Sequence, residues 1–163
     1  MLRIALLVSA ALSLGAASAA CAGSVDADDV RAFAALNQRS LVLTTGLTGL
    51  EGAGGGRDAY TCLDTLRSAS SDLYTRLNNL SDLVSANYSV DSSANASALS
   101  VDIRAVRSAM RSVRARISQA KSTCDRSFLF QLQSQKLIDL LNDTSQSLGK
   151  LKGKMTVADS GAK

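Results

Sequence analysis

The sequence predicts an all-α fold, an up-down-up-down four-helix bundle with long helices and coiled-coil-like packing. Three observations lead to this prediction. Pro is absent from all 163 residues, apolar residues recur at three- and four-residue spacing, and three breaks divide this pattern into four segments. A chain without Pro suits long uninterrupted helices and argues against a loop-rich β-sandwich. Its length is that of one domain with a sizeable core.

The composition excludes several functional classes. The chain contains no His and no Trp, and aromatic residues make up 4% of it. Without His there are no His ligands for haem, di-iron or zinc, and no Ser-His or Cys-His nucleophile pair. The formal net charge of +4 is too small to indicate a nucleic-acid-binding protein. We therefore expect no cofactor, no metal site and no nucleic-acid partner.

Residues 1–22 have the order of a secretory signal peptide. Met1–Arg3 is a short basic start, Ile4–Leu14 is an uncharged and mainly apolar run, and residues 15–22 are mostly small. The apolar run is shorter than the about 20 residues that a membrane-spanning helix needs. A retained N-terminal anchor helix is the alternative. The segment is short and Ala-rich, as in bacterial export signals, so we expect the protein in the periplasm or outside the cell.

The position of cleavage decides the fate of Cys21. Cleavage after Ala19 leaves Cys21 near the new N-terminus, and cleavage after Ala22 removes it. A third interpretation takes residues 18–21 as a degraded lipobox, which makes Cys21 a lipidation site and the protein a membrane-anchored lipoprotein. Ser18 stands where such a motif usually has Leu. Contact with a membrane is expected only in this third case.

Four segments carry the helical pattern, and together they form a bundle domain over residues 23–155. The first two apolar rows are Phe33, Leu36, Leu43, Leu47 and Leu50, then Leu63, Leu66, Leu73, Leu77, Leu80 and Val84. The other two are Leu99, Ile103, Val106, Met110, Val113, Ile117, Ala120 and Cys124, then Phe130, Leu137, Leu141, Leu148, Leu151 and Met155. Ser40 and Ser70 fill the missing steps of the first two rows. Residues 156–163 have no periodicity and are expected to be a disordered tail.

The last of the three breaks is the weakest. Residues 52–56 are Gly-rich and residues 87–95 are rich in Ser and Asn, but residues 122–127 contain neither Gly nor Pro. One helix of about 60 residues across segments three and four is therefore the competing interpretation. The apolar row of segment three would continue onto mainly polar residues, while the leucines of segment four follow a shifted phase. This change favours two helices, with Asp125 or Ser127 capping the fourth.

Cys62 and Cys124 are predicted to form a disulfide. In an antiparallel hairpin, two residues at the same level are equally far from the turn, and the midpoint of this pair is residue 93, inside the second break. An exported protein is expected to oxidise such a pair. Two free buried thiols are the alternative, since a catalytic thiol would lack a His partner.

Segment three also carries a basic row beside its apolar row. The row consists of Arg104, Arg107, Arg111, Arg114 and Lys121, with Arg116 on the other flank. The hairpin geometry sets Asp82 across from Arg104 and Asp72 across from Arg114, and we expect these to pair. The remaining basic residues are the candidate contacts for an anionic partner, namely Arg107, Arg111, Arg116 and Lys121. The alternative is the solvated flank of an amphipathic helix.

Other polar residues indicate no chemistry. Tyr60, Tyr74 and Tyr88 recur every 14 residues, a pattern more typical of a core boundary than of a carbohydrate site. The aspartates at residues 26, 28 and 29 suit a helix N-terminus and lack the spacing of a calcium loop. Glu51 is the one glutamate, and no pair of acids lies on an apolar face.

The sequence therefore predicts a non-enzymatic exported protein whose partner is a protein or another component of the cell envelope. We expect an envelope interaction, adaptor or inhibitor-type protein. The alternative is a protein that binds anionic envelope components, such as lipid headgroups or lipopolysaccharide, through the basic row. The sequence does not predict the oligomeric state.

Overall fold

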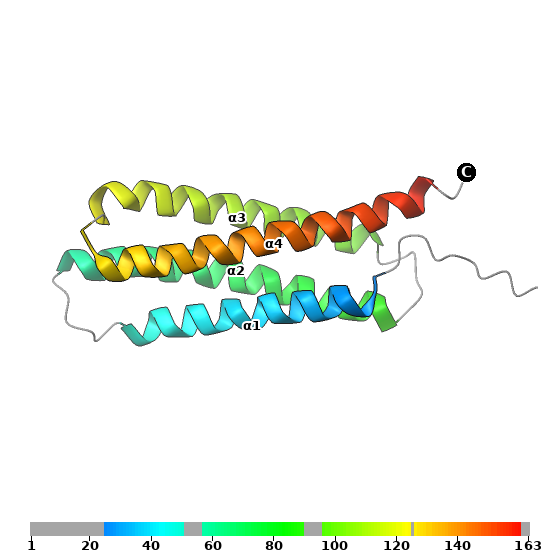
Figure 1. The fold of residues 1–163 in the computed structure, drawn as a ribbon, viewed down its shortest axis with the longest axis horizontal. Coiled ribbons are helices and arrows are strands. Elements are labelled where there is room, and N and C mark those ends of the chain that lie inside the picture. The colour runs from blue at the N-terminus through cyan, green and yellow to red at the C-terminus, as the bar shows by residue number, and fades with distance from the viewer. Residues whose placement is uncertain (1–24, 51–56, 90–95, 125, 161–163) are drawn as a thin grey trace, which may run out of the picture.

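The computed structural model describes residues 25–50, 57–89, 96–124 and 126–160. Four helices follow one another: α1 (Ala27–Gly49), α2 (Arg57–Ser89), α3 (Ala96–Cys124) and α4 (Phe128–Ser160). Each helix runs antiparallel to the one before it (Figure 1). The predicted up-down-up-down four-helix bundle is confirmed, and no strand occurs in the described ranges.

Several features of the sequence lie outside the described residues. These are the predicted signal peptide over residues 1–22 with Cys21, the Gly-rich residues 52–56, and residues 90–95 of the second break. At the other end of the chain, α4 continues as a helix to Ser160, beyond the expected end of the bundle at Met155. Residues 161–163 again lie outside the description.

The aspartate cluster forms the start of α1. The side chain of Asp26 accepts hydrogen bonds from the backbone N–H groups of Asp28 and Asp29, each 3.0 Å long. The carboxylate of Asp29 in turn accepts a hydrogen bond from the backbone N–H of Asp26 at 3.1 Å. This capping box satisfies N–H groups that have no partner within the helix, and its negative charges complement the helix dipole.

The third break ends one helix and begins another, so the single-helix interpretation is wrong. The backbone N–H of Ser127 donates to the carbonyl of Cys124 at 2.9 Å, and the Ser127 hydroxyl accepts the N–H of Phe130 at 3.3 Å. Ser127 is thus the cap of α4, as one of the two predicted candidates.

One core runs through all four helices. Every residue of the four predicted apolar rows is either buried or packed against the buried cluster, and Ser40 and Ser70 are fully buried among them. The rows omitted Leu140 and Thr144, which are also buried. α2 makes its most extensive contacts with α1 and α3, while α4 contacts α1 more than it contacts α3. The bundle is therefore built around α2.

Polar side chains join α1 to α2 at the edge of this core. The hydroxyls of Thr44 and Ser70 lie 2.7 Å apart, and the Asn37 amide donates to the side-chain oxygen of Asn78 at 2.9 Å. Ser70 is buried and the other three residues are half-buried. These hydrogen bonds form only in one register of the two helices, so they favour the observed alignment over a slipped one.

Candidate functional site

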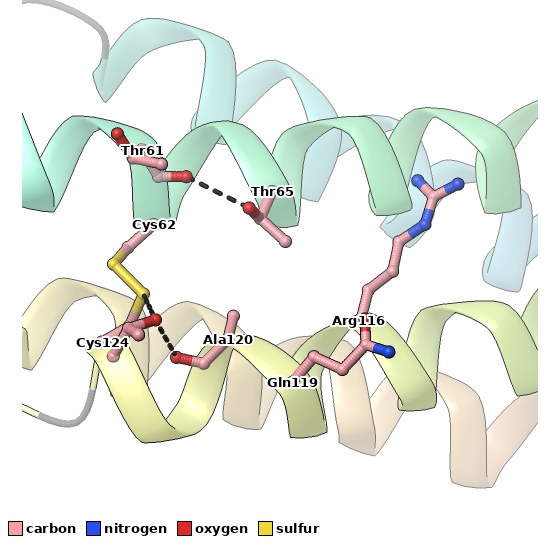
Figure 2. Close-up of a pocket in the computed structure, with 8 residues that line it drawn as sticks. Thr61, Cys62, Thr65, Arg116, Gln119, Ala120 and Cys124 are labelled. Carbon is pink, nitrogen blue, oxygen red and sulfur yellow. Dashed lines mark hydrogen bonds between the residues drawn. A yellow bond between two sulfur atoms is a disulfide. The ribbon is translucent and has the colours of Figure 1, made fainter.

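The disulfide predicted between Cys62 and Cys124 is present. It joins the first turns of α2 to the last residue of α3, with the two Cα atoms 5.8 Å apart and both side chains buried (Figure 2). This Cα separation is typical of disulfides. The bond closes the end of the hairpin opposite the α2–α3 connection.

An open hollow of about 650 Å³ lies beside the disulfide, between α2 and α3 (Figure 2). The Thr65 hydroxyl donates to the carbonyl of Thr61, and the Thr123 hydroxyl donates to the carbonyl of Ala120, each at 3.1 Å. These hydroxyls are engaged by their own helices. Arg116 borders the hollow and donates to the Ser68 hydroxyl of α2 at 3.1 Å. The hollow therefore presents no set of converging groups suited to acid–base chemistry.

The basic row of α3 lies on the surface of the bundle. Arg111 and Lys121 are exposed and Arg107 is half-buried. Within the part of the chain that the structure describes, no hydrogen bond or ion pair engages these three side chains. Arg116, the fourth candidate, points to α2 and stands apart from them. The structure thus leaves three of the four candidate contacts available to a partner.

The two predicted ion pairs across the hairpin are wrong. Arg104 donates to the Ser100 carbonyl of its own helix at 3.3 Å, and Arg114 donates to Asn142 of α4 at 3.0 Å. The prediction considered how far along the hairpin each residue lies. It did not consider in which direction each side chain points around the helix axis. Arg114 occupies the flank of α3 that faces α4, whereas Arg116 occupies the flank that faces α2.

Charge is concentrated on α3. The helix has six basic residues and one acid, Asp102, which gives it a net charge of +5 against +4 for the whole chain. The remainder of the protein is therefore slightly acidic. The partner of Arg114 on α4 is the neutral side chain of Asn142. Helical steps of three, four and seven residues from Asn142 reach Gln135, Ile138, Asp139, Ser145, Gln146 and Gly149, so one acid lies among these positions.

The other sequence candidates do not form a site. Tyr74 is half-buried and Tyr88 is exposed, while the side chain of Tyr60 lies outside the described set. Among the residues described, no group of three or more Cys, Asp or Glu side chains is arranged to hold a metal ion. None of the helices, within those same ranges, has a stretch long and apolar enough to span a membrane.

Sequence reasoning missed the ion pairs between α1 and α4, among them a contact at the opposite end of the bundle from the disulfide. Lys154 of α4 donates to Asp26 at 2.6 Å and to Asp29 at 2.7 Å. The hydrogen bond from Lys154, with those from the backbone of α1, lowers the pKa of Asp26 from 3.8 to about 2. Burial alone would lower the pKa of Lys154, but the two carboxylates raise it. No spacing rule relates residues this far apart in the sequence.

The chain matches no protein-family model, no curated protein and no solved structure.

Proposed function

We propose that this is an exported, non-enzymatic helical-bundle protein that acts through contacts of its surface, as an envelope interaction, adaptor or inhibitor-type protein. The observation that carries the proposal is the basic face of α3, which we define as Arg104, Arg107, Arg111, Arg114 and Lys121. An ordinary solvated helix flank mixes both signs of charge. The face of α3 instead gathers cations, and three of them have no partner within the described ranges.

A pull-down from the native envelope tests this proposal. The bait is the oxidised protein, compared with the double variant Arg107→Gln/Arg111→Gln. The matched control is Arg76→Gln/Lys150→Gln, which removes two exposed cations from α2 and α4 instead. A partner of the basic face is retained by the wild type and the control and lost by the double variant. Equal retention by all three baits contradicts the proposal.

A second candidate function is the binding of an anionic envelope component itself, a lipid headgroup or lipopolysaccharide phosphate. The length of the basic face favours it, because Arg104 to Lys121 spans about 25 Å along the helix at 1.5 Å per residue. Such a row can lie along a negatively charged membrane surface, where each Lys or Arg contributes about 1 kcal/mol.

Vesicle sedimentation separates the two candidates. Vesicles of phosphatidylglycerol and phosphatidylcholine, vesicles of phosphatidylcholine alone, and lipopolysaccharide aggregates are the probes. The second candidate predicts binding to the anionic probes that weakens steeply with salt, since about 0.1 M salt screens charges beyond about 10 Å. Arg107→Gln/Arg111→Gln should bind more weakly than Arg76→Gln/Lys150→Gln. Absence of binding to every anionic probe at low salt leaves a protein as the partner.

A further inference from the structure

The surface formed by α1 and α4 carries exposed apolar side chains and charges of both signs, whereas the face of α3 is basic. Of the six large apolar side chains exposed in the described ranges, four belong to these two helices: Leu41, Val42, Phe128 and Leu132. Val42 is 65% exposed and Phe128 is 74% exposed. Because α1 and α4 are antiparallel neighbours, the second half of α1 and the first turns of α4 lie at the same end of the bundle (Figure 1). Val42, Phe128 and Leu132 therefore lie at the same end of the bundle. Leu41 is at helical spacing from Asn37 and Thr44, whose side chains bond to α2, so it lies on the flank of α1 that faces α2.

A groove of about 520 Å³ runs between the two helices in this region. Val42, Leu43 and Gly46 line it from α1, and Gln133 and Leu140 line it from α4. Of the exposed apolar side chains, Val42 lines this depression. We refer to this groove and its surroundings as the α1–α4 face.

The outer side of the second half of α1 lacks the charges that a surface helix normally carries. Residues 40–49 contain no charged side chain, although Leu41, Val42, Thr45, Gly46 and Gly49 are exposed. A helix that faces water on one side usually has charged residues there, and one that is apolar all round is usually covered. The composition of α1 is therefore that of a helix with a second contact.

Gly46 lies within α1 and Gly49 ends it, and both face open space. A Cβ atom added at either position would meet no atom within 4 Å, as is also true of Gly149 and Gly153 of α4. Gly destabilises a helix interior relative to Ala, because it loses more backbone freedom on folding. The absence of a side chain is useful where another helix approaches closely from outside.

The charges around the groove suit a second copy of the same surface. Arg39, Lys136 and Asp139 line the groove, and Arg39 forms an ion pair at 2.6 Å with Asp143 of α4, which is not a lining residue. Together these four side chains are two cations and two anions, so the surface around the groove is neutral. A two-fold axis brings the same patch of both copies together, so cations of one copy can approach anions of the other. A partner with a strong charge of one sign would not find opposite charges for all of its own on this neutral surface.

The length of α1 sets the upper limit of the face. α1 has 23 residues, and a helix of that length is about 34 Å long at 1.5 Å per residue. Two packed helices, with axes about 8–10 Å apart and side chains on either side, present a strip about 20 Å wide. Such a strip covers at most about 680 Å², somewhat less than the about 800 Å² that each partner contributes to a standard interface.

We propose that the α1–α4 face is the interface of a homodimer, in which α1 and α4 of two copies pack around a two-fold axis. This inference rests on α1 and α4 alone and is independent of the function proposed for α3. It leaves the basic faces of both copies accessible.

Sedimentation equilibrium of the mature, oxidised protein tests the interface. Val42→Asp places a charge in the middle of the face and should weaken dimerisation by at least about tenfold. The matched control is Val101→Asp, since Val101 is similarly exposed but lies on α3. The control should dimerise as the wild type does. A wild type that stays monomeric at high micromolar concentration overturns the proposal, and so does a dimer that Val42→Asp leaves intact.

Gly46→Ala provides a test in which the fold is not at risk. The added methyl group meets open space in the single chain, so it should raise the melting temperature of the monomer through helix propensity. In the dimer the same methyl group stands between two helices and should weaken association. Unchanged association of this variant contradicts close helix packing at Gly46.

Non-reducing denaturing electrophoresis distinguishes this dimer from one linked through Cys21. A dimer that is wholly covalent contradicts the proposal.

Discussion

The ammonium group of Lys154 lies 2.7 Å from a carboxylate oxygen of Asp29, and this contact ties the last turns of α4 to the first turn of α1. Asp29 is buried, and it belongs to the capping box that starts α1. The disulfide joins α2 to α3 at the opposite end of the bundle. The α2–α3 hairpin is therefore closed by a disulfide, and α1 and α4 are joined by an ion pair.

Replacing Lys154 should make the stability of the protein depend differently on pH. The pKa of Asp26 is lowered to about 2 in the folded protein, mainly by its hydrogen bond with Lys154. The stability that this carboxylate contributes is thus present above its ordinary value of 3.8 and is lost as the pH falls through about 2. Lys154→Met should melt a few degrees below the wild type at pH 7, and the difference should shrink between pH 4 and pH 2.

The control for this prediction is Lys150→Met. Lys150 is exposed and makes no hydrogen bond or ion pair with a described side chain, so its replacement should leave the melting temperature nearly unchanged at every pH. Thermal melts followed by circular dichroism over this pH range provide the measurement. A difference between Lys154→Met and the wild type that is constant down to pH 2 would contradict the electrostatic explanation.

Charge placed in the core of α3 should unfold the protein, whereas charge beside the core should not. Met110 and Val113 are buried, and an unpaired aspartate at either position costs several kcal/mol out of the about 5–15 kcal/mol that stabilise a domain. Arg107→Asp and Arg111→Asp change side chains that lie beside the core. Far-UV circular dichroism should therefore show a folded protein for both arginine variants and loss of helix for Met110→Asp and Val113→Asp. Equal damage in all four would contradict the observed phase of α3.

Two neighbouring polar residues of the core should respond in opposite ways. The Ser40 hydroxyl is buried and has no hydrogen-bond partner among the described groups, so Ser40→Ala should be neutral or stabilising. Thr44→Val removes the partner of Ser70 and leaves that buried hydroxyl unpaired, which should cost about 1–3 kcal/mol. Urea denaturation measures both. A destabilised Ser40→Ala would mean that its hydroxyl has a partner in solution.

The core was predictable because its pattern is local. Spacing of three and four residues placed Met110, Val113 and the other apolar residues on the inner side of their helices, and the equal distances of Cys62 and Cys124 from the turn predicted the disulfide. Leu140 and Thr144 were missed because α4 contacts each of the other three helices, so its buried side is wider than one row.

The surface was less predictable because it depends on how helices face one another. Sequence spacing predicted the position of Arg114 along the hairpin but not the direction of its side chain around the helix axis. That side chain points to Asn142 of α4 and not to Asp72 of α2. The contact between Lys154 and Asp29 joins residues 125 positions apart, and no periodic pattern relates them. Only the packing of α4 on α1 brings them together.

The intact mass of the protein purified from its native host, measured without reduction, tests most directly the claim that this is an exported, disulfide-clamped bundle. We predict a chain that begins between Ala20 and Gly23 and is two hydrogen atoms lighter than its reduced form, with an added diacylglycerol if Cys21 is lipidated. A mass that includes Met1, with Cys62 and Cys124 as free thiols, would contradict the account.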